Sequence, residues 1–109
     1  MHDEPEICEI DVQEAKRLLD EKAAIFVDVR MGRDYANAHV PGAIHLRDDN
    51  VEDFIEKTPR DARIVVYCYH GYVSVGGAGF LRSRGFTDVC SISGGFEAWR
   101  PQFPTERSA

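Results

Sequence analysis

The sequence predicts a single α/β domain built on a mainly parallel sheet of five strands. Short apolar runs rich in β-branched residues recur along the chain, and segments with helical periodicity separate them. This alternation is typical of parallel strands joined by helical crossovers. The length of 109 residues suits one domain, and hydrophobic residues at 43% are enough for a core. We therefore expect one domain over residues 1–109, with its core at about 7–100 and polar termini.

The first part of the chain predicts a strand, a helix and a second strand. Ile7–Ile10 is the first strand-sized apolar run. Asp11 is placed to cap the next helix, and Glu14 three residues later completes a capping-box pattern. An apolar helical stripe then continues to about Glu21, and the β-branched run Ile25–Val29 predicts the second strand.

The middle of the chain predicts two short helices around a third strand. Residues Arg33–Ala38 favour a short helix, and Pro41-Gly42 marks a turn before the strand Ala43–Leu46. Asn50 is expected to cap a further helix, because an apolar stripe follows it, and Thr58-Pro59 ends that helix.

The last part contains the clearest strand of all, Ile64–Tyr67, which Cys68 follows directly. A helix is expected to begin near Ser74 and to end at a glycine, Gly85. Val89–Ile92 predicts the fifth strand, and Phe96–Arg100 predicts a short final helix.

Charge and hydropathy exclude several classes of function. The chain carries 13 basic and 19 acidic residues, a net charge of −6, which opposes nucleic-acid binding. The apolar runs are strand-sized, so we expect no membrane association. The segment Met1–Pro5 is polar and acidic, unlike a secretory signal, and we expect a cytoplasmic protein.

The cysteines are three, an odd number, at positions 8, 68 and 90. They show neither a CxxC pattern nor a cysteine-histidine pattern with metal spacing, so we expect neither a disulfide framework nor a zinc site. Cys8 and Cys90 lie inside predicted strands, where a cysteine is usually a small core residue. Cys68 is the candidate for chemistry.

Cys68 and Arg30 each follow a predicted strand, and ligands of open α/β sheets bind beyond the carboxyl ends of strands. After Cys68 comes a tight loop and then a helix, a combination that directs amide N–H groups and partial positive charge at an anion. Both effects lower the pKa of a cysteine. Gly71 suits a loop position with positive φ. We therefore expect a charged, exposed sulfur here.

A cysteine-dependent phosphatase or arsenate reductase is a weaker interpretation of the same loop. The Cys-x5-Arg pattern of such phosphatases needs an arginine six positions after the cysteine, where this chain has Ser74. Without that cation, the loop lacks the bidentate contacts that stabilise a phosphoryl dianion.

Four stretches of the chain carry a family resemblance: Val27–Arg30, His39–Leu46, Cys68–Gly71 and Ser93–Trp99. They resemble the rhodanese family, in particular its short single-domain bacterial thiosulfate sulfurtransferases. Each is weak alone, but their order and spacing together are specific, and the similarity extends from about Ile7 to Pro104.

The resemblance implies a rhodanese-like domain, with helices on both faces of the sheet. It also implies that Cys68 is the nucleophile of a thiosulfate sulfurtransferase, and that Asp28 and Arg30 belong to the framework around the site. The implied substrate-binding residues follow the nucleophile along the chain: Tyr69, His70, Gly71, Tyr72, Val73 and Ser74. His39 and His45 are expected to be structural, as is the packing of Trp99 with Phe96.

The implied chemistry transfers sulfane sulfur through a Cys68 persulfide. The donor is thiosulfate, a small anion, or a related sulfur donor. The acceptor is thiophilic: cyanide, or a thiol such as thioredoxin or another small dithiol protein. No metal or organic cofactor is needed. His70 could serve as a general base, but a thiolate held by amides needs none, so we favour a lesser role. A monomer or homodimer is expected.

One departure from the family pattern concerns the loop's fifth position after the cysteine, which often carries Ser, Thr or Arg and is Val73 here, after the bulky Tyr72. A group that could bind the sulfonate end of thiosulfate is missing, although Ser74 could compensate. We therefore expect weak thiosulfate binding. The altered pair also keeps open an alternative, a non-catalytic rhodanese-like interaction or regulatory module.

Overall fold

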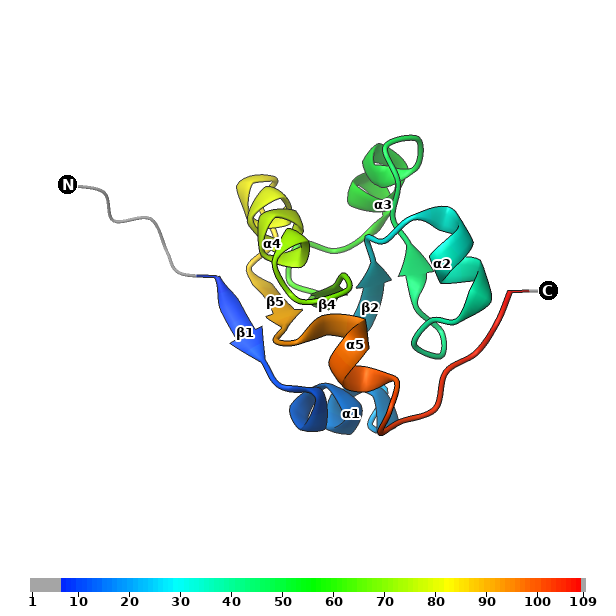
Figure 1. Cartoon of the computed structure of the whole chain (residues 1–109). Coiled ribbons are helices and arrows are strands. Elements are labelled where there is room, and N and C mark those ends of the chain that lie inside the picture. Colours follow the sequence, from blue (N-terminus) through cyan, green and yellow to red (C-terminus); the bar gives the residue numbers. More distant parts are fainter. Residues whose placement is uncertain (1–6, 109) are drawn as a thin grey trace.

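The computed structural model describes residues 7–108 and confirms the α/β architecture (Figure 1). The segment Met1–Pro5, whose sequence is unlike a secretory signal, lies outside the described residues. All paired strands are parallel, in the order β1-β5-β4-β2-β3. The strands are β1 Cys8–Ile10, β2 Ile25–Asp28, β3 Ile44–His45, β4 Arg63–Tyr67 and β5 Asp88–Ile92. The helices are α1 Val12–Asp20, α2 Gly32–Asn37, α3 Val51–Lys57, α4 Val73–Ser83 and α5 Gly95–Trp99.

The local signals place the elements as expected but differ in detail at two helix starts. Asp11 caps α1 by accepting a hydrogen bond from the Glu14 amide at 2.8 Å, while the Glu14 carboxylate pairs with Arg17. Asn50 stands at the start of α3, but its side chain makes no cap. That side chain instead bonds backward to the amide of Arg47 and the carbonyl of His45, and so fixes the turn before α3.

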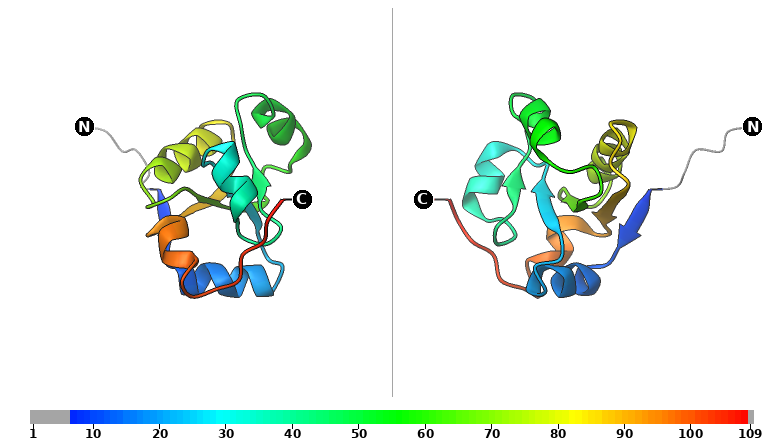
Figure 2. Two further views of the ribbon diagram at one scale, coloured as in Figure 1. Left: turned by 45° about the vertical axis from the view of Figure 1, so that its right-hand side comes forward. Right: turned by 180° about the vertical axis from the view of Figure 1, so that it is seen from behind.

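Helices cover both faces of the sheet and give the domain two apolar cores (Figure 2). One core lies under α1 and α5 and includes Tyr67, Phe96 and the fully buried Trp99. The other lies under α3 and α4 and includes Val66 and Phe86. Side chains alternate between the faces along each strand, so the central strand β4 contributes to both cores.

The C-terminal tail is tied to the body of the domain. Residues His39 and Glu106 form an antiparallel bridge, and the Glu106 carboxylate accepts a hydrogen bond from the Gly42 amide at 2.8 Å. His39 is buried and stacks on Tyr35, and His45 is buried with Nε2 2.7 Å from the Arg30 carbonyl oxygen. Both histidines therefore hold backbone segments in place.

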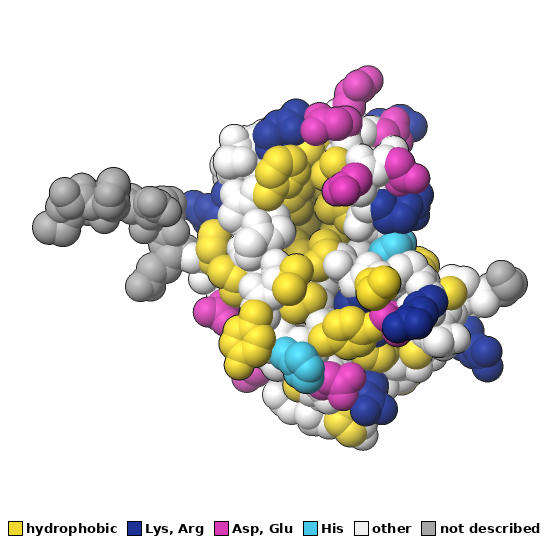
Figure 3. All heavy atoms as spheres, turned by 45° about the horizontal axis from the view of Figure 1, so that its top comes forward, with side chains coloured by type: hydrophobic (Ala, Val, Ile, Leu, Met, Phe, Trp, Pro, Cys, Tyr) yellow, Lys and Arg dark blue, Asp and Glu magenta, His cyan; other side chains and the backbone are white. Residues whose placement is uncertain are grey.

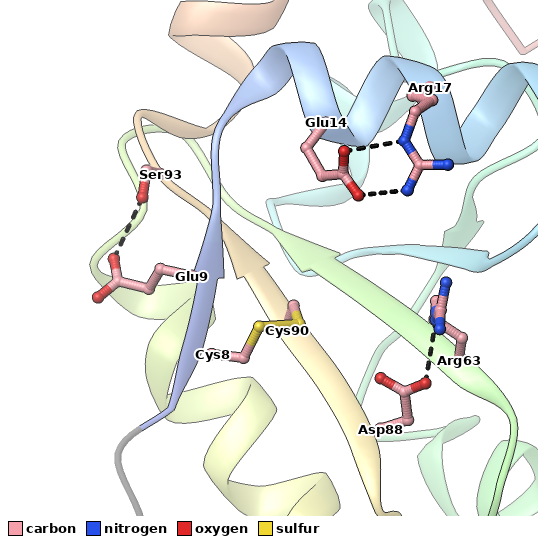
Figure 4. Close-up of a disulfide and its surroundings, with 8 residues drawn as sticks. All are labelled: Cys8, Glu9, Glu14, Arg17, Arg63, Asp88, Cys90 and Ser93. Atoms are coloured by element: carbon pink, nitrogen blue, oxygen red, sulfur yellow. Dashed lines mark hydrogen bonds and ion pairs between the residues drawn. A yellow bond between two sulfur atoms is a disulfide. The ribbon is translucent and has the colours of Figure 1, made fainter.

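A disulfide joins Cys8 to Cys90, and the expectation that neither cysteine would pair was wrong (Figure 4). The two residues are register partners on the neighbouring strands β1 and β5, with Cα atoms 4.5 Å apart. The three cysteines are one disulfide pair and one free cysteine. The pair could not be predicted from the sequence, because its two residues are 82 positions apart and only the strand order of the sheet brings them together. They also lie outside the buried core, with Cys8 exposed and Cys90 half-buried.

Within residues 7–108, no helix has the length and apolar character needed to cross a membrane.

Candidate active site

Cys68 lies immediately beyond the central strand β4, and two backbone amides point at its sulfur. The amides of Gly71 and Ser74 each lie 3.2 Å from Cys68 Sγ. Gly71 has a φ of +98°, and a Cβ there would meet the backbone of β5 at 3.1 Å, so glycine is required. The Ser74 amide belongs to the first turn of α4, whose N-terminal end carries partial positive charge. The loop is therefore the amide cradle that the sequence predicts.

The sulfur is more buried than expected. Cys68 is 4% exposed and forms part of the wall of a pocket of about 280 Å³. Burial raises the pKa of its thiol, but hydrogen bonds from the Ser74 side chain and from the amides of Ser74, Gly71 and His70 outweigh burial and bring the pKa below its ordinary value. The site therefore favours a thiolate.

The hydroxyl of Ser74 also contacts the sulfur and is itself hydrogen-bonded to a residue of β5. Ser74 Oγ lies 3.4 Å from Cys68 Sγ and 2.7 Å from Ser91 Oγ. Both serines are fully buried. Ser74 thus faces inward toward the sulfur, so the idea that it compensates for a missing sulfonate ligand at the mouth finds no support in its placement.

The start of α5 holds the beginning of the loop. The Phe96 amide donates to the Cys68 carbonyl at 2.8 Å, and the Glu97 amide donates to the Tyr69 carbonyl at 3.0 Å. This approach needs a glycine at position 95, where a Cβ would lie 2.5–2.6 Å from those two carbonyl oxygens. The stretch Ser93–Trp99 therefore supports the loop as well as the core.

Asp28 and Arg30 form a buried ion pair beside the loop. Arg30 Nη2 donates to Asp28 Oδ2 at 2.8 Å, and Nε lies 3.1 and 3.2 Å from the two carboxylate oxygens. The guanidinium also donates to the Ala38 carbonyl and lies 4.0 Å from the ring centre of Phe96. Arg30 lines the pocket, but its guanidinium is paired with the Asp28 carboxylate. This pairing is consistent with a framework role.

The mouth of the pocket is apolar. Met31, Tyr72 and Val73 line it and are 64%, 84% and 67% exposed. Apolar side chains gather in a band on the face shown in Figure 3, with charged side chains around the band. The rest of the lining is Val29, Arg30, Cys68, Tyr69 and His70. Val73 lines the mouth without a hydroxyl that could bind the sulfonate end of thiosulfate.

The structure thus brings most of the predicted site residues to one pocket, which is lined by Arg30, Cys68, Tyr69, His70, Tyr72 and Val73. The other three do not line it: Gly71 and Ser74 contact the Cys68 sulfur, and Asp28 pairs with Arg30. Sequence reasoning missed Ser91 and Gly95. Ser91 had no signal of its own, because a lone serine in a strand is unremarkable until the sheet places it behind Ser74. Gly95 lies inside the stretch Ser93–Trp99, but only the fold shows that it lets α5 contact the loop.

Comparisons with known proteins match most of the chain to one family. The family described as "Rhodanese-like domain" matches residues 11–102. The chain is 44% identical over 96 residues to the thiosulfate sulfurtransferase GlpE of Pseudomonas fluorescens strain SBW25, covering 88% of each protein. It is 42% identical to the protein of the same name from Pseudomonas savastanoi pv. phaseolicola, covering 85% of this chain and 88% of that one.

The fold has relatives among solved structures as well. A rhodanese-like domain protein from Staphylococcus aureus superposes with a TM-score of 0.82 at 25% identity, over 94% of this chain and all of the other. The rhodanese-like domain of an Anabaena protein gives a TM-score of 0.82 at 28% identity, over 91% of this chain and 78% of the other. Together with the sequence match over most of its length, this shows that the chain belongs to the rhodanese family.

Proposed function

We propose that the protein is a thiosulfate sulfurtransferase that carries sulfur as a persulfide on Cys68. The observation that carries the proposal is the pair of amides, from Gly71 and Ser74, each 3.2 Å from the Cys68 sulfur. The names of the curated relatives support thiosulfate as the donor.

The first half-reaction forms the persulfide. The Cys68 thiolate attacks the outer sulfur of thiosulfate, a new S–S bond forms, and the S–S bond of thiosulfate breaks. The electron pair of the broken bond leaves with sulfite, so the total charge is unchanged. The amide N–H groups stabilise the negative charge by hydrogen bonds and transfer no proton. The proposal therefore assigns His70 no role as a general base.

The second half-reaction returns the thiolate. Cyanide or a thiolate attacks the outer sulfur of the persulfide, and the S–S bond to Cys68 breaks with its electron pair remaining on Cys68. The products are thiocyanate or the persulfide of the acceptor. A dithiol protein such as thioredoxin is the proposed protein acceptor, and a monomer or homodimer is the proposed assembly.

A cytoplasmic location stays a prediction. The Cys8–Cys90 disulfide is a feature more common in oxidising compartments. Trapping free thiols in intact cells, before lysis, would show whether this pair is oxidised where the protein works.

The test is to mix the protein with thiosulfate, remove the excess and measure the intact mass. We expect a gain of one sulfur atom, its loss on adding cyanide, and no gain in Cys68→Ser. A Cys8→Ser, Cys90→Ser double variant is the matched control and should still take up sulfur, because those residues lie on β1 and β5 and do not line the pocket of Cys68.

Other outcomes favour the two alternatives. No adduct with thiosulfate or any other sulfane donor would support the non-catalytic module. Phosphate release from an aryl phosphate would support the phosphatase, although Ser74 stands where the arginine of such a loop is needed and faces the sulfur.

A further inference from the structure

We propose that Ser91 is a positioning residue that orients the Ser74 hydroxyl toward the Cys68 sulfur. The inference rests on the proposed function in taking Cys68 as the nucleophile, and it adds a residue from outside the active-site loop. Ser91 lies on β5 and Ser74 in the first turn of α4, and their hydroxyl oxygens are 2.7 Å apart.

The two hydroxyls and the sulfur form a short chain of hydrogen bonds. Ser74 Oγ lies between Ser91 Oγ at 2.7 Å and Cys68 Sγ at 3.4 Å. Both serines are fully buried, so the partners of these hydroxyls come from the protein. Among the described residues, no buried side-chain nitrogen or oxygen lacks a hydrogen-bond partner.

The charge of the sulfur decides which group donates in each of these hydrogen bonds. A hydroxyl has one proton to donate and two lone pairs to accept with. When Cys68 is a thiol, its S–H can donate to Ser74, which is then free to donate to Ser91. When Cys68 is a thiolate, Ser74 must donate to the sulfur, and Ser91 must therefore be the donor in the Ser91–Ser74 bond. Ser91 thereby stabilises the arrangement that the anion needs.

The position of Ser91 in the sheet makes this bond rigid. Ser91 is the register partner of Val66 on β4, and Cys68 directly follows β4 in the chain, so the strand before the nucleophile and the strand that carries Ser91 are paired neighbours in the sheet. Its neighbour Cys90 points to the opposite face and is tied to Cys8. A hydroxyl on such a strand has little freedom to move away from Ser74.

Other ionisable groups near the sulfur do not replace this bond. Arg30 lines the pocket from the end of β2 and is paired with Asp28. Tyr69, His70 and Tyr72 line it from the loop. The causes that shift the pKa of Cys68 are its burial and its hydrogen bonds, with Ser74 foremost among those bonds.

The experiment measures the rate of Cys68 alkylation by iodoacetamide as a function of pH, without any sulfur donor. Cys68 is the free cysteine of the described residues, so the signal comes from one site. We expect Ser91→Ala to move the midpoint to higher pH, with alkylation at pH 6 slower by about twofold to fivefold. Ser74→Ala should move it further. Ser83→Ala, an exposed serine on the same helix, is the control and should move nothing.

The double variant gives the decisive comparison. Because Ser91 acts through Ser74, adding Ser91→Ala to Ser74→Ala should cause no further shift. An equal shift in both backgrounds, or an unchanged midpoint in Ser91→Ala despite lower thermal stability, would overturn the proposal. Alkylation does not depend on sulfur uptake, so a failure of the proposed sulfurtransferase function would be seen separately.

Discussion

Cys8 and Cys90 lie directly opposite each other on the parallel strands β1 and β5 and are joined by a disulfide. β1 is an edge strand of only three residues, and β5 is its one neighbour in the sheet. The link therefore ties the start of the described chain to the strand that carries Ser91.

Breaking this disulfide should destabilise the fold. The link closes a loop across a sequence separation of 82 residues, and losing it should lower the free energy of unfolding by about 2–5 kcal/mol. Urea unfolding with and without a reductant measures the effect. Cys8→Ser should be as unstable as the reduced protein and should not respond to the reductant. Equal midpoints for the oxidised and reduced protein would contradict the prediction.

Val73→Ser should strengthen thiosulfate binding. Val73 lines an apolar mouth and is 67% exposed, so a hydroxyl there adds a donor for the sulfonate that remains partly in water. We expect the KM for thiosulfate to fall by about threefold to tenfold, less than a fully buried bond to a charged group would give. Val73→Ala, which removes the same apolar bulk without adding a donor, is the control. If KM is the same in both variants, the account of weak binding is wrong.

Arg30→Met should destabilise the protein strongly through Asp28. The side chains of the pair are 2% and 0% exposed, so the substitution leaves a buried carboxylate without its cation. The expected loss is about 3–5 kcal/mol of unfolding free energy. Adding Asp28→Asn should recover part of that loss, because it removes the uncompensated charge. Chemical unfolding of the two single variants and the double variant tests this. If the losses of unfolding free energy of the single variants simply add in the double variant, Arg30 and Asp28 do not stabilise the fold as a pair.

Much of the fold follows from local sequence signals. The strand Ile64–Tyr67 is apolar and β-branched, and the structure confirms it as the central strand β4. Asp11 caps α1 as its position before an apolar stripe predicts. Gly71 has the positive φ that its loop needs. Each of these features is fixed by residues close together in the chain.

What the sequence did not reveal depends on long-range pairing. The Cys8–Cys90 bond follows from the strand order, which places β1 beside β5. Ser91 gains its role only when β5 lies behind α4. Asn50 shows a smaller failure, because its side chain had nearer partners in the preceding turn than the amides of α3.

The central claim is that hydrogen bonds from the loop lower the pKa of Cys68 below its ordinary value despite its burial, and the pH dependence of its alkylation tests this most directly. Because the pKa of Cys68 is lowered in the folded state, thiolate formation stabilises the fold above the unfolded-state pKa, and this stability is lost as pH falls through the folded-state pKa. We predict that the midpoint of the alkylation profile lies at lower pH in the folded protein than in the same protein unfolded in urea. A folded-state midpoint at or above that of the unfolded chain would contradict the account.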